Sequence, residues 1–255
     1  MNVAVTPNDH RLGAEVCRAL WTAEDLDLLI SLDSEEPISN VAEAHVVVDF
    51  HGVDVIMDHL QWCVEHGKHV VVGCSGFTDA MFEQVRSWLR GRPDVGVLIA
   101  ENFSIGAALS TVLARYAARF YESVEIVEMH PQDRDVPSPS AVATAGAIAQ
   151  ARATTETSPP EPQAGSTAHL GDGEGRGAPV HGVPVHGLRM AGAASHQETH
   201  FGTAGEILTI RRDTLDVAAY TPGVLSAVRY VSRHPGLTIG IEPAIHLPRD
   251  DSDRW

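Results

Sequence analysis

Basic residues are scarce in this chain of 255 residues, because 18 lysines and arginines stand against 34 aspartates and glutamates, for a formal net charge of −16. A chain this acidic is repelled by phosphate, which argues against nucleic acid or an anionic membrane as its main partner. Long apolar runs are absent too, and none approaches the roughly 20 residues of a membrane helix. The opening MNVAVTPNDH has neither the basic nor the apolar segment of a secretory signal.

Cysteine is also scarce. Cys17, Cys63 and Cys74 are odd in number and widely spaced, which argues against a disulfide framework and predicts a reduced, cytoplasmic protein. Hydrophobic residues nevertheless make up 44% of the chain, an ordinary share for a folded protein. The length leaves room for one large domain or two smaller ones around a substantial core.

The first hundred residues alternate between strand and helix patterns. Runs of apolar and β-branched residues predict strands at residues 2–6, 26–33, 44–50, 68–73 and 94–100. Apolar residues at helical spacing predict helices at residues 13–23, 53–67 and 79–90. This alternation predicts an α/β fold, with a Rossmann-type doubly wound parallel sheet covered by helices on both faces.

The pattern changes after residue 100. Helices are expected at 104–120 and 139–152, and strands at 123–130, 183–201 and 205–214. Pro, Gly, Ser and Thr predict a long loop over residues 153–182. A helix at 222–233 and a strand at 237–242 close the fold, before a frayed tail.

We therefore expect two domains. Residues 1–106 and 219–255 form the nucleotide-binding-type domain, to which the last helix and strand return. Residues 107–218 form an α+β domain with a mainly antiparallel open sheet, which binds substrate and mediates oligomerisation.

Several segments of the sequence, taken together and in order, match the motifs of a known protein family. VVVDF at 46–50, VVGCSGF at 71–77, AENFSIGAAL at 100–109 and the block at 182–210, GVPVHGLRMAGAASHQETHFGTAGEILTI, occur in this order. Along nearly its whole length the chain resembles the dihydrodipicolinate reductases of bacterial lysine biosynthesis. The resemblance implies NAD(P)H-dependent reduction of a cyclic imine that carries carboxylates, in a homotetramer assembled through the sheets of the second domain.

The turn after the first strand differs from the family pattern, which is G-x-x-G-x-x-G. Pro7, His10 and Gly13 occupy these columns. Pro7 has no N–H, and Asp9 brings a negative charge to the place of a pyrophosphate, whereas Arg11 and the helix start attract phosphate. We expect NADH or NADPH to bind weakly, or not at all.

Other cofactor contacts follow from the resemblance. An acidic residue at position 33 favours NADH over NADPH. The GCSG loop would form the wall beside the nicotinamide, in which Cys74 is interpreted as inert packing. The residues implied to bind the cofactor are Arg11, Gly13, Asp33, Gly73, Ser75, Gly76, Asn102 and Phe103.

The segment EMHPQDRDVPSPSAVATA, from Glu128, resembles the family's E-x-H-H-x-x-K-x-D-A-P-S-G-T-A with one residue missing. His130 matches the first His, which handles protons in the family. The Lys column falls on Asp133 or Arg134. Arginine is a poor proton donor, and aspartate serves as an acid only if its pKa is raised.

The family's Ser-Gly-Thr turn holds a substrate carboxylate, and Ser138 and Ser140 occupy the outer columns here. The same segment also predicts a helix start, with Ser138 as N-cap and Pro139 in the first turn, and both readings are compatible. Arg189 and His196 lie in the best-matching block and are candidates for gripping an acid group. His181, His186, His196 and His200 fit no standard ligand spacing, so no metal site is expected.

Two function classes remain open. One is a divergent NAD(P)H-dependent reductase of a cyclic imine or related acid, in a specialised rather than a housekeeping role. The other is a cofactor-independent enzyme on the same fold, which catalyses dehydration, cyclisation or isomerisation of an amino-acid-like substrate, or a non-catalytic partner protein. In either enzyme class, the substrate is a small carboxylic acid.

Overall fold

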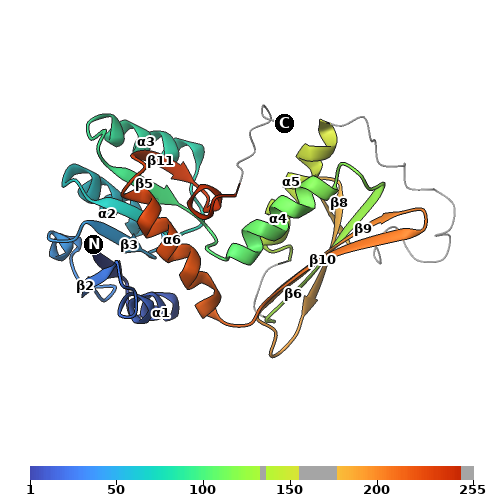
Figure 1. Cartoon of the computed structure of the whole chain (residues 1–255), viewed down its shortest axis with the longest axis horizontal. Coiled ribbons are helices and arrows are strands. Elements are labelled where there is room, and N and C mark those ends of the chain that lie inside the picture. The colour runs from blue at the N-terminus through green and yellow to red at the C-terminus, as the bar shows by residue number, and fades with distance from the viewer. Residues whose placement is uncertain (133–135, 155–176, 248–255) are drawn as a thin grey trace. The chain divides into compact units, whose positions relative to one another are not determined.

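The computed structural model describes residues 1–132, 136–154 and 177–247. The chain divides into two compact units, and the second is an insertion in the first (Figure 1). Unit 1 comprises Met1–Ile105 and Val217–Trp255, and unit 2 comprises Gly106–Asp216. None of the helices in the described part of the chain has the length and apolar character that crossing a bilayer takes.

Unit 1 contains a six-stranded sheet in which all neighbouring strands are parallel. Its order is β11 (Gly236–Ile239), β5 (Gly96–Ile99), β4 (His69–Val72), β3 (Val46–Asp49), β1 (Asn2–Thr6) and β2 (Asp27–Ser31). The helices are α1 (Arg11–Leu20), α2 (Val53–Glu65), α3 (Asp79–Arg90) and α6 (Thr221–Val231), with short 3₁₀ turns η1 (Ile38–Val41), η2 (Val217–Tyr220) and η3 (Glu242–Ile245). The predicted Rossmann-type sheet is confirmed.

The strand β3 is buried from end to end, which explains its run of three valines. Val46, Val47 and Val48 have no exposed surface, since helices pack on the sheet. α1 packs against α6, and α2 packs against α3. The strand order reverses between β1 and β3, and in such sheets ligands bind outside the carboxyl ends of the strands at this point.

Unit 2 is a mixed five-stranded sheet with two helices. Its order is β10 (Glu206–Thr214), β9 (Ser195–Thr203), β6 (Ser123–His130), β8 (Val183–Arg189) and β7 (Ala178–Val180). β6 and β8 are parallel, and the other three pairs are antiparallel, as the predicted mainly antiparallel sheet requires. The helices α4 (Ile105–Ala117) and α5 (Pro139–Ala153) share a core with Ile126 and Phe201.

Two expectations for unit 2 were wrong. Residues 178–180 were expected in a loop but form β7, because His181 (φ 49°) and Gly182 (φ 80°) make a two-residue hairpin turn to β8. The expected β-run at 183–201 is two strands on opposite sides of β6, separated by residues 190–194. Most of the predicted loop, residues 155–176, and the predicted frayed tail lie outside the described residues.

Candidate active site and cofactor turn

A buried carboxylate, Glu128, organises one end of unit 2. Side chains in β6 alternate between the two faces of the sheet, so Glu128 lies on the same face as Val124, Ile126 and His130, under the helices. Glu128 has no exposed surface. Burial of a charge is tolerated only when partners compensate it, and Glu128 has three.

The three partners of Glu128 come from three different elements. The backbone N–H of Ser138 donates to the carboxylate, 3.1 Å from each oxygen. Arg189 Nη2 donates to Oε1 at 2.8 Å, and His130 Nε2 lies 3.4 Å from Oε2. We call these four residues the Glu128 cluster.

The local sequence explains why these partners meet. Ser138 is the N-cap of α5, its Oγ accepts from Ala141 N–H at 3.3 Å, and Pro139 occupies the first turn, so the predicted helix start is confirmed. Arg189 ends β8 and lies opposite His130 in the parallel pairing with β6. Ser140 joins through its Oγ, 3.1 Å from Ser138 Oγ.

The cluster holds Glu128 in its charged form. Burial alone would raise the pKa of Glu128, but the nearby His130 and the hydrogen bonds from Ser138 and Arg189 outweigh it and lower that pKa to about 2. Glu128 therefore stays a carboxylate at neutral pH, and its role is to orient its neighbours.

His196, expected to grip the substrate, lies on the opposite face of the sheet. It pairs in register with Met129, whereas Glu128 pairs with Gln197. Its Nδ1 bonds Asp213 of β10 at 2.7 Å. Because successive strand residues face opposite sides, His196 does not join the Glu128 cluster.

Sequence reasoning overlooked Glu128 and Gln197 as site residues. Gln197 Nε2 donates to Thr144 Oγ1 at 2.9 Å, and Thr144 Oγ1 lies 3.1 Å from Thr111 Oγ1, which extends the polar network along α5 and α4. Alternation was the available signal, since SVEIVEMH puts Glu128 in phase with two buried aliphatic residues. Asp133 and Arg134 lie outside the described residues.

In unit 1, two positions of the turn between β1 and α1, Pro7 and Asn8, offer a phosphate no free N–H. Pro7 has no N–H, and the N–H of Asn8 donates to Leu32 O at 2.8 Å. Asp9 Oδ2 accepts from Ser34 Oγ at 2.8 Å, which ties this acidic residue to the segment after β2. Arg11 is the first residue of α1. The first turn of this helix, which the structure describes throughout, contains no acidic residue.

Comparison with known proteins matches both units to one family. The sequence models described as dihydrodipicolinate reductase, N-terminus, and dihydrodipicolinate reductase, C-terminus, match residues 1–103 and 106–244. The chain belongs to the dihydrodipicolinate reductase family. The resemblance stated from the sequence is confirmed.

Relatives of this family align over nearly the whole chain. The 4-hydroxy-tetrahydrodipicolinate reductase of Mycolicibacterium gilvum is 48% identical over 97% of this chain and 100% of its own length. That of Nocardia farcinica is 47% identical over 97% and 99%. A dipicolinate-bound dihydrodipicolinate reductase from Paenisporosarcina sp. TG-14 has a TM-score of 0.83 at 26% identity, covering 95% and 98% of the chains.

The residues that the family resemblance assigns to the cofactor follow the carboxyl ends of the strands of unit 1. Asp33 follows β2, and its N–H donates to Glu36 Oε2 at 2.9 Å. Gly73, Ser75 and Gly76 follow β4, and the N–H of Gly73 donates to Asp49 O at 2.8 Å. Burial raises the pKa of nearby Cys74, which keeps it a thiol.

Asn102 and Phe103 shape the start of the segment after β5. Asn102 Oδ1 accepts from Ser104 N–H at 2.8 Å. Phe103 is only 2% exposed and meets the ring of Phe50 edge to face, with centroids 6.5 Å apart. Phe103 is thus a core residue of unit 1 in this structure.

Gly13, the one family glycine kept in the turn, is needed for packing. A Cβ at this position would lie 2.1 Å from the carbonyl oxygen of Pro7, far inside contact distance. We expect Gly13→Ala to lower the free energy of unfolding by about 2–4 kcal/mol, because backbone must move. Thermal unfolding measures the effect. Gly91→Ala is the control, because its Cβ would meet its nearest neighbour at 3.4 Å, and an equal loss there would contradict this role.

Proposed function

We propose that this protein is a nicotinamide-dependent reductase of a cyclic imine or a related amino-acid-derived carboxylic acid. The observation that carries the proposal is the Glu128 cluster, which gathers an imidazole, a guanidinium and a helix N-cap in unit 2. The cationic Arg189, with the Ser138 and Ser140 hydroxyls, suits a carboxylate. His130 handles the proton that must accompany hydride transfer to an imine.

The proton donor differs from that of the family pattern. Lys68 is the only lysine in the sequence, and its Nζ donates to Ala42 O in unit 1. We infer that Asp133 or Arg134 takes the family lysine's place, Asp133 as an acid or Arg134 as a substrate clamp. Such a change favours a substrate other than 4-hydroxy-tetrahydrodipicolinate, the compound named for the relatives. Assays with that compound and with other cyclic imino acids test this directly.

The cofactor turn supports a second candidate, a cofactor-independent enzyme on the same fold. Pro7 and the engaged N–H of Asn8 leave the turn poor in donors, and Asp9 repels a pyrophosphate. Calorimetric titration with NADH and NADPH separates the two candidates. Saturable micromolar binding, tighter for NADH because of Asp33, supports the reductase. No binding at millimolar cofactor supports the cofactor-independent enzyme or a partner protein.

If the turn between β1 and α1 limits cofactor binding, restoring the family's glycines in it should raise the affinity for NADH. We expect the combined variant Pro7→Gly, Asp9→Asn and His10→Gly to strengthen NADH binding by about 1–3 kcal/mol, because donors are regained and a repelling charge is removed. Calorimetry measures the change, and Asp9→Asn alone is the control for charge. Unchanged affinity in the combined variant would mean that the turn does not contact the cofactor.

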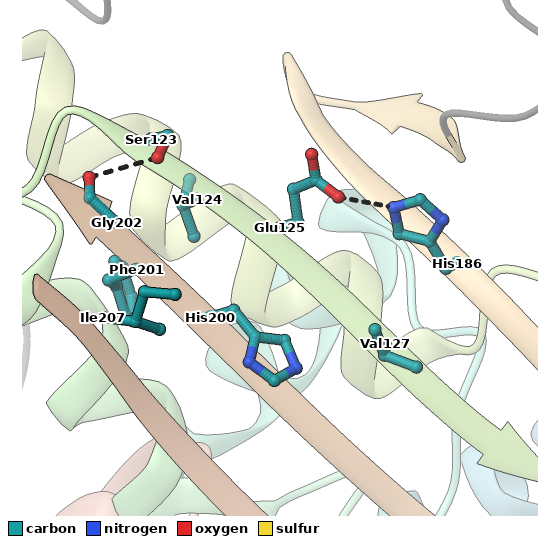
Figure 2. A pocket seen from close by; sticks show the side chains of 9 residues that line it. All are labelled: Ser123, Val124, Glu125, Val127, His186, His200, Phe201, Gly202 and Ile207. Carbon is teal, nitrogen blue, oxygen red and sulfur yellow. Dashed lines mark hydrogen bonds and ion pairs between the residues drawn. The ribbon is translucent and has the colours of Figure 1, made fainter. Parts of the chain in front are cut away.

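We propose further that the protein is a homotetramer, with a dimer as the second choice. The face of the unit 2 sheet opposite its helices carries a pocket with exposed apolar groups, and Ile207 is 75% exposed (Figure 2). His186 Nε2 bonds Glu125 Oε2 at 2.8 Å on this face. An edge strand with exposed apolar side chains, such as Ile207 and Leu208 of β10, is hazardous when left uncovered.

Light scattering at working concentration tests the assembly, with a tetrameric mass expected. Ile207→Glu should reduce that mass, because the new carboxylate would be buried in the contact. Glu83→Ala, on the exposed surface of α3 in unit 1, is the control and should leave the mass unchanged. A monomeric mass for the unaltered protein would refute the proposal.

A further inference from the structure

A second buried cluster lies in unit 1, apart from the Glu128 cluster. Asp49, the last residue of β3, has no exposed surface, and its two oxygens meet two imidazoles. Asp49 Oδ1 lies 2.7 Å from His51 Nδ1, and Oδ2 lies 2.8 Å from His59 Nδ1. The proposed reduction uses none of these three residues.

The three side chains converge from two directions. His51 follows β3, and its backbone N–H also donates to Asp49 Oδ1 at 2.9 Å. His59 comes from the second turn of α2. The two rings meet edge to face with centroids 4.9 Å apart, and one ligand atom of each residue lies within 4.8 Å of the others.

This donor set is that of a transition-metal site. Two imidazole nitrogens and one carboxylate are common zinc ligands, with zinc–ligand distances of about 2.0–2.2 Å. Ligand atoms around such an ion lie about 3.3–3.5 Å apart. The two hydrogen-bonded pairs here are 2.7 and 2.8 Å apart, and the three ligand atoms all lie within 4.8 Å of one another.

One further observation points to a ligand. Asp49 pairs with Thr6 of β1 and Val72 of β4, which puts the cluster at the carboxyl ends of the strands, beside the reversal of strand order where such sheets take ligands.

We propose that Asp49, His51 and His59 bind one divalent transition-metal ion, with zinc as the best match. Three protein ligands leave a tetrahedral ion one position for water or an anion. The inference is independent of the proposed reductase, because it concerns binding of the metal alone.

The test uses the full chain, purified without a polyhistidine tag and stripped with a chelator. Calorimetry should find one tight equivalent of Zn²⁺, and His59→Asn and His51→Asn should each weaken it on the order of 100-fold or more. His200→Asn is the control, since this histidine pairs with Glu198 on the unit 2 sheet and should leave binding unchanged. Zn²⁺ should also raise the melting temperature of the unaltered protein but not of His59→Asn.

One further measurement needs no variant. X-ray absorption of the protein loaded with one equivalent of Zn²⁺ should contain scattering from two imidazoles and further light atoms. Absence of a tight equivalent, equal binding by His59→Asn, or a zinc shell without two imidazoles would each overturn the proposal. None of these results depends on whether NADH binds or a substrate is reduced.

Discussion

Glu128→Ala should lower the free energy of unfolding by about 3–5 kcal/mol. The substitution leaves the Arg189 guanidinium, the Ser138 N–H and His130 without their shared partner in a buried place. Denaturant unfolding at fixed protein concentration measures the loss. Glu128→Gln should cost less, about 1–3 kcal/mol, because it keeps the shape and one acceptor oxygen.

The control for charge is Glu83→Ala, which removes an exposed carboxylate paired with Arg86 and should cost less than about 1 kcal/mol. The dependence of stability on pH provides a second check of the role of the Glu128 charge. The pKa of Glu128 is about 2 in the fold against 4.5 ordinarily, so its ionisation stabilises the fold fully above pH 4.5 and loses this effect as the pH falls toward 2. The stability gap between Glu128→Gln and the unaltered protein should narrow over that range. A constant gap would contradict the role given to the charge.

His130→Ala should reduce turnover of the natural substrate on the order of 10²–10⁴-fold, the usual contribution of a general acid or base. His130 is the proton-handling residue kept from the family motif, and Glu128 holds it beside Arg189. The measurement is kcat with saturating substrate, by cofactor oxidation or by product formation. His196→Ala is the matched control, because that histidine lies on the other face of the same sheet, and it should retain activity.

Asp133→Asn then separates the roles of the two residues in the lysine column. A large loss of kcat makes Asp133 the substitute acid, and no loss points to Arg134 as a substrate clamp. If His130→Ala left the natural reaction untouched, the Glu128 cluster would not be the active site. A binding or scaffolding role would then be the better interpretation.

The Rossmann-type half of the fold was predictable, because short apolar strands such as β3 alternate with helices such as α2 that have an apolar face. β7 was not, because the turn His181–Gly182 lacks the Asn-Gly or Asp-Gly pair that signals a two-residue hairpin. In β6 and β9 the alternation was visible, but the sequence does not say which residues face each other, so His196 was favoured over Gln197.

The two polar clusters differ in how many of their residues could be predicted from the sequence. His130, Ser138 and Arg189 were found through the family motifs, and their meeting point, Glu128, required the strand register. The Asp49, His51 and His59 cluster joins a strand end to the second turn of a helix, and no spacing rule for metal ligands covers that geometry.

The parallel pairing of β11 with β5 has a consequence for synthesis of the chain. Residues 236–239 are synthesised well after residues 96–99, with which they pair. Until then the nascent sheet ends at β5, whose backbone donors and acceptors are open to other chains. All of unit 2, residues 106–216, is synthesised before the strand that closes this edge. A product truncated before residue 236 would therefore leave the edge of β5 unpaired.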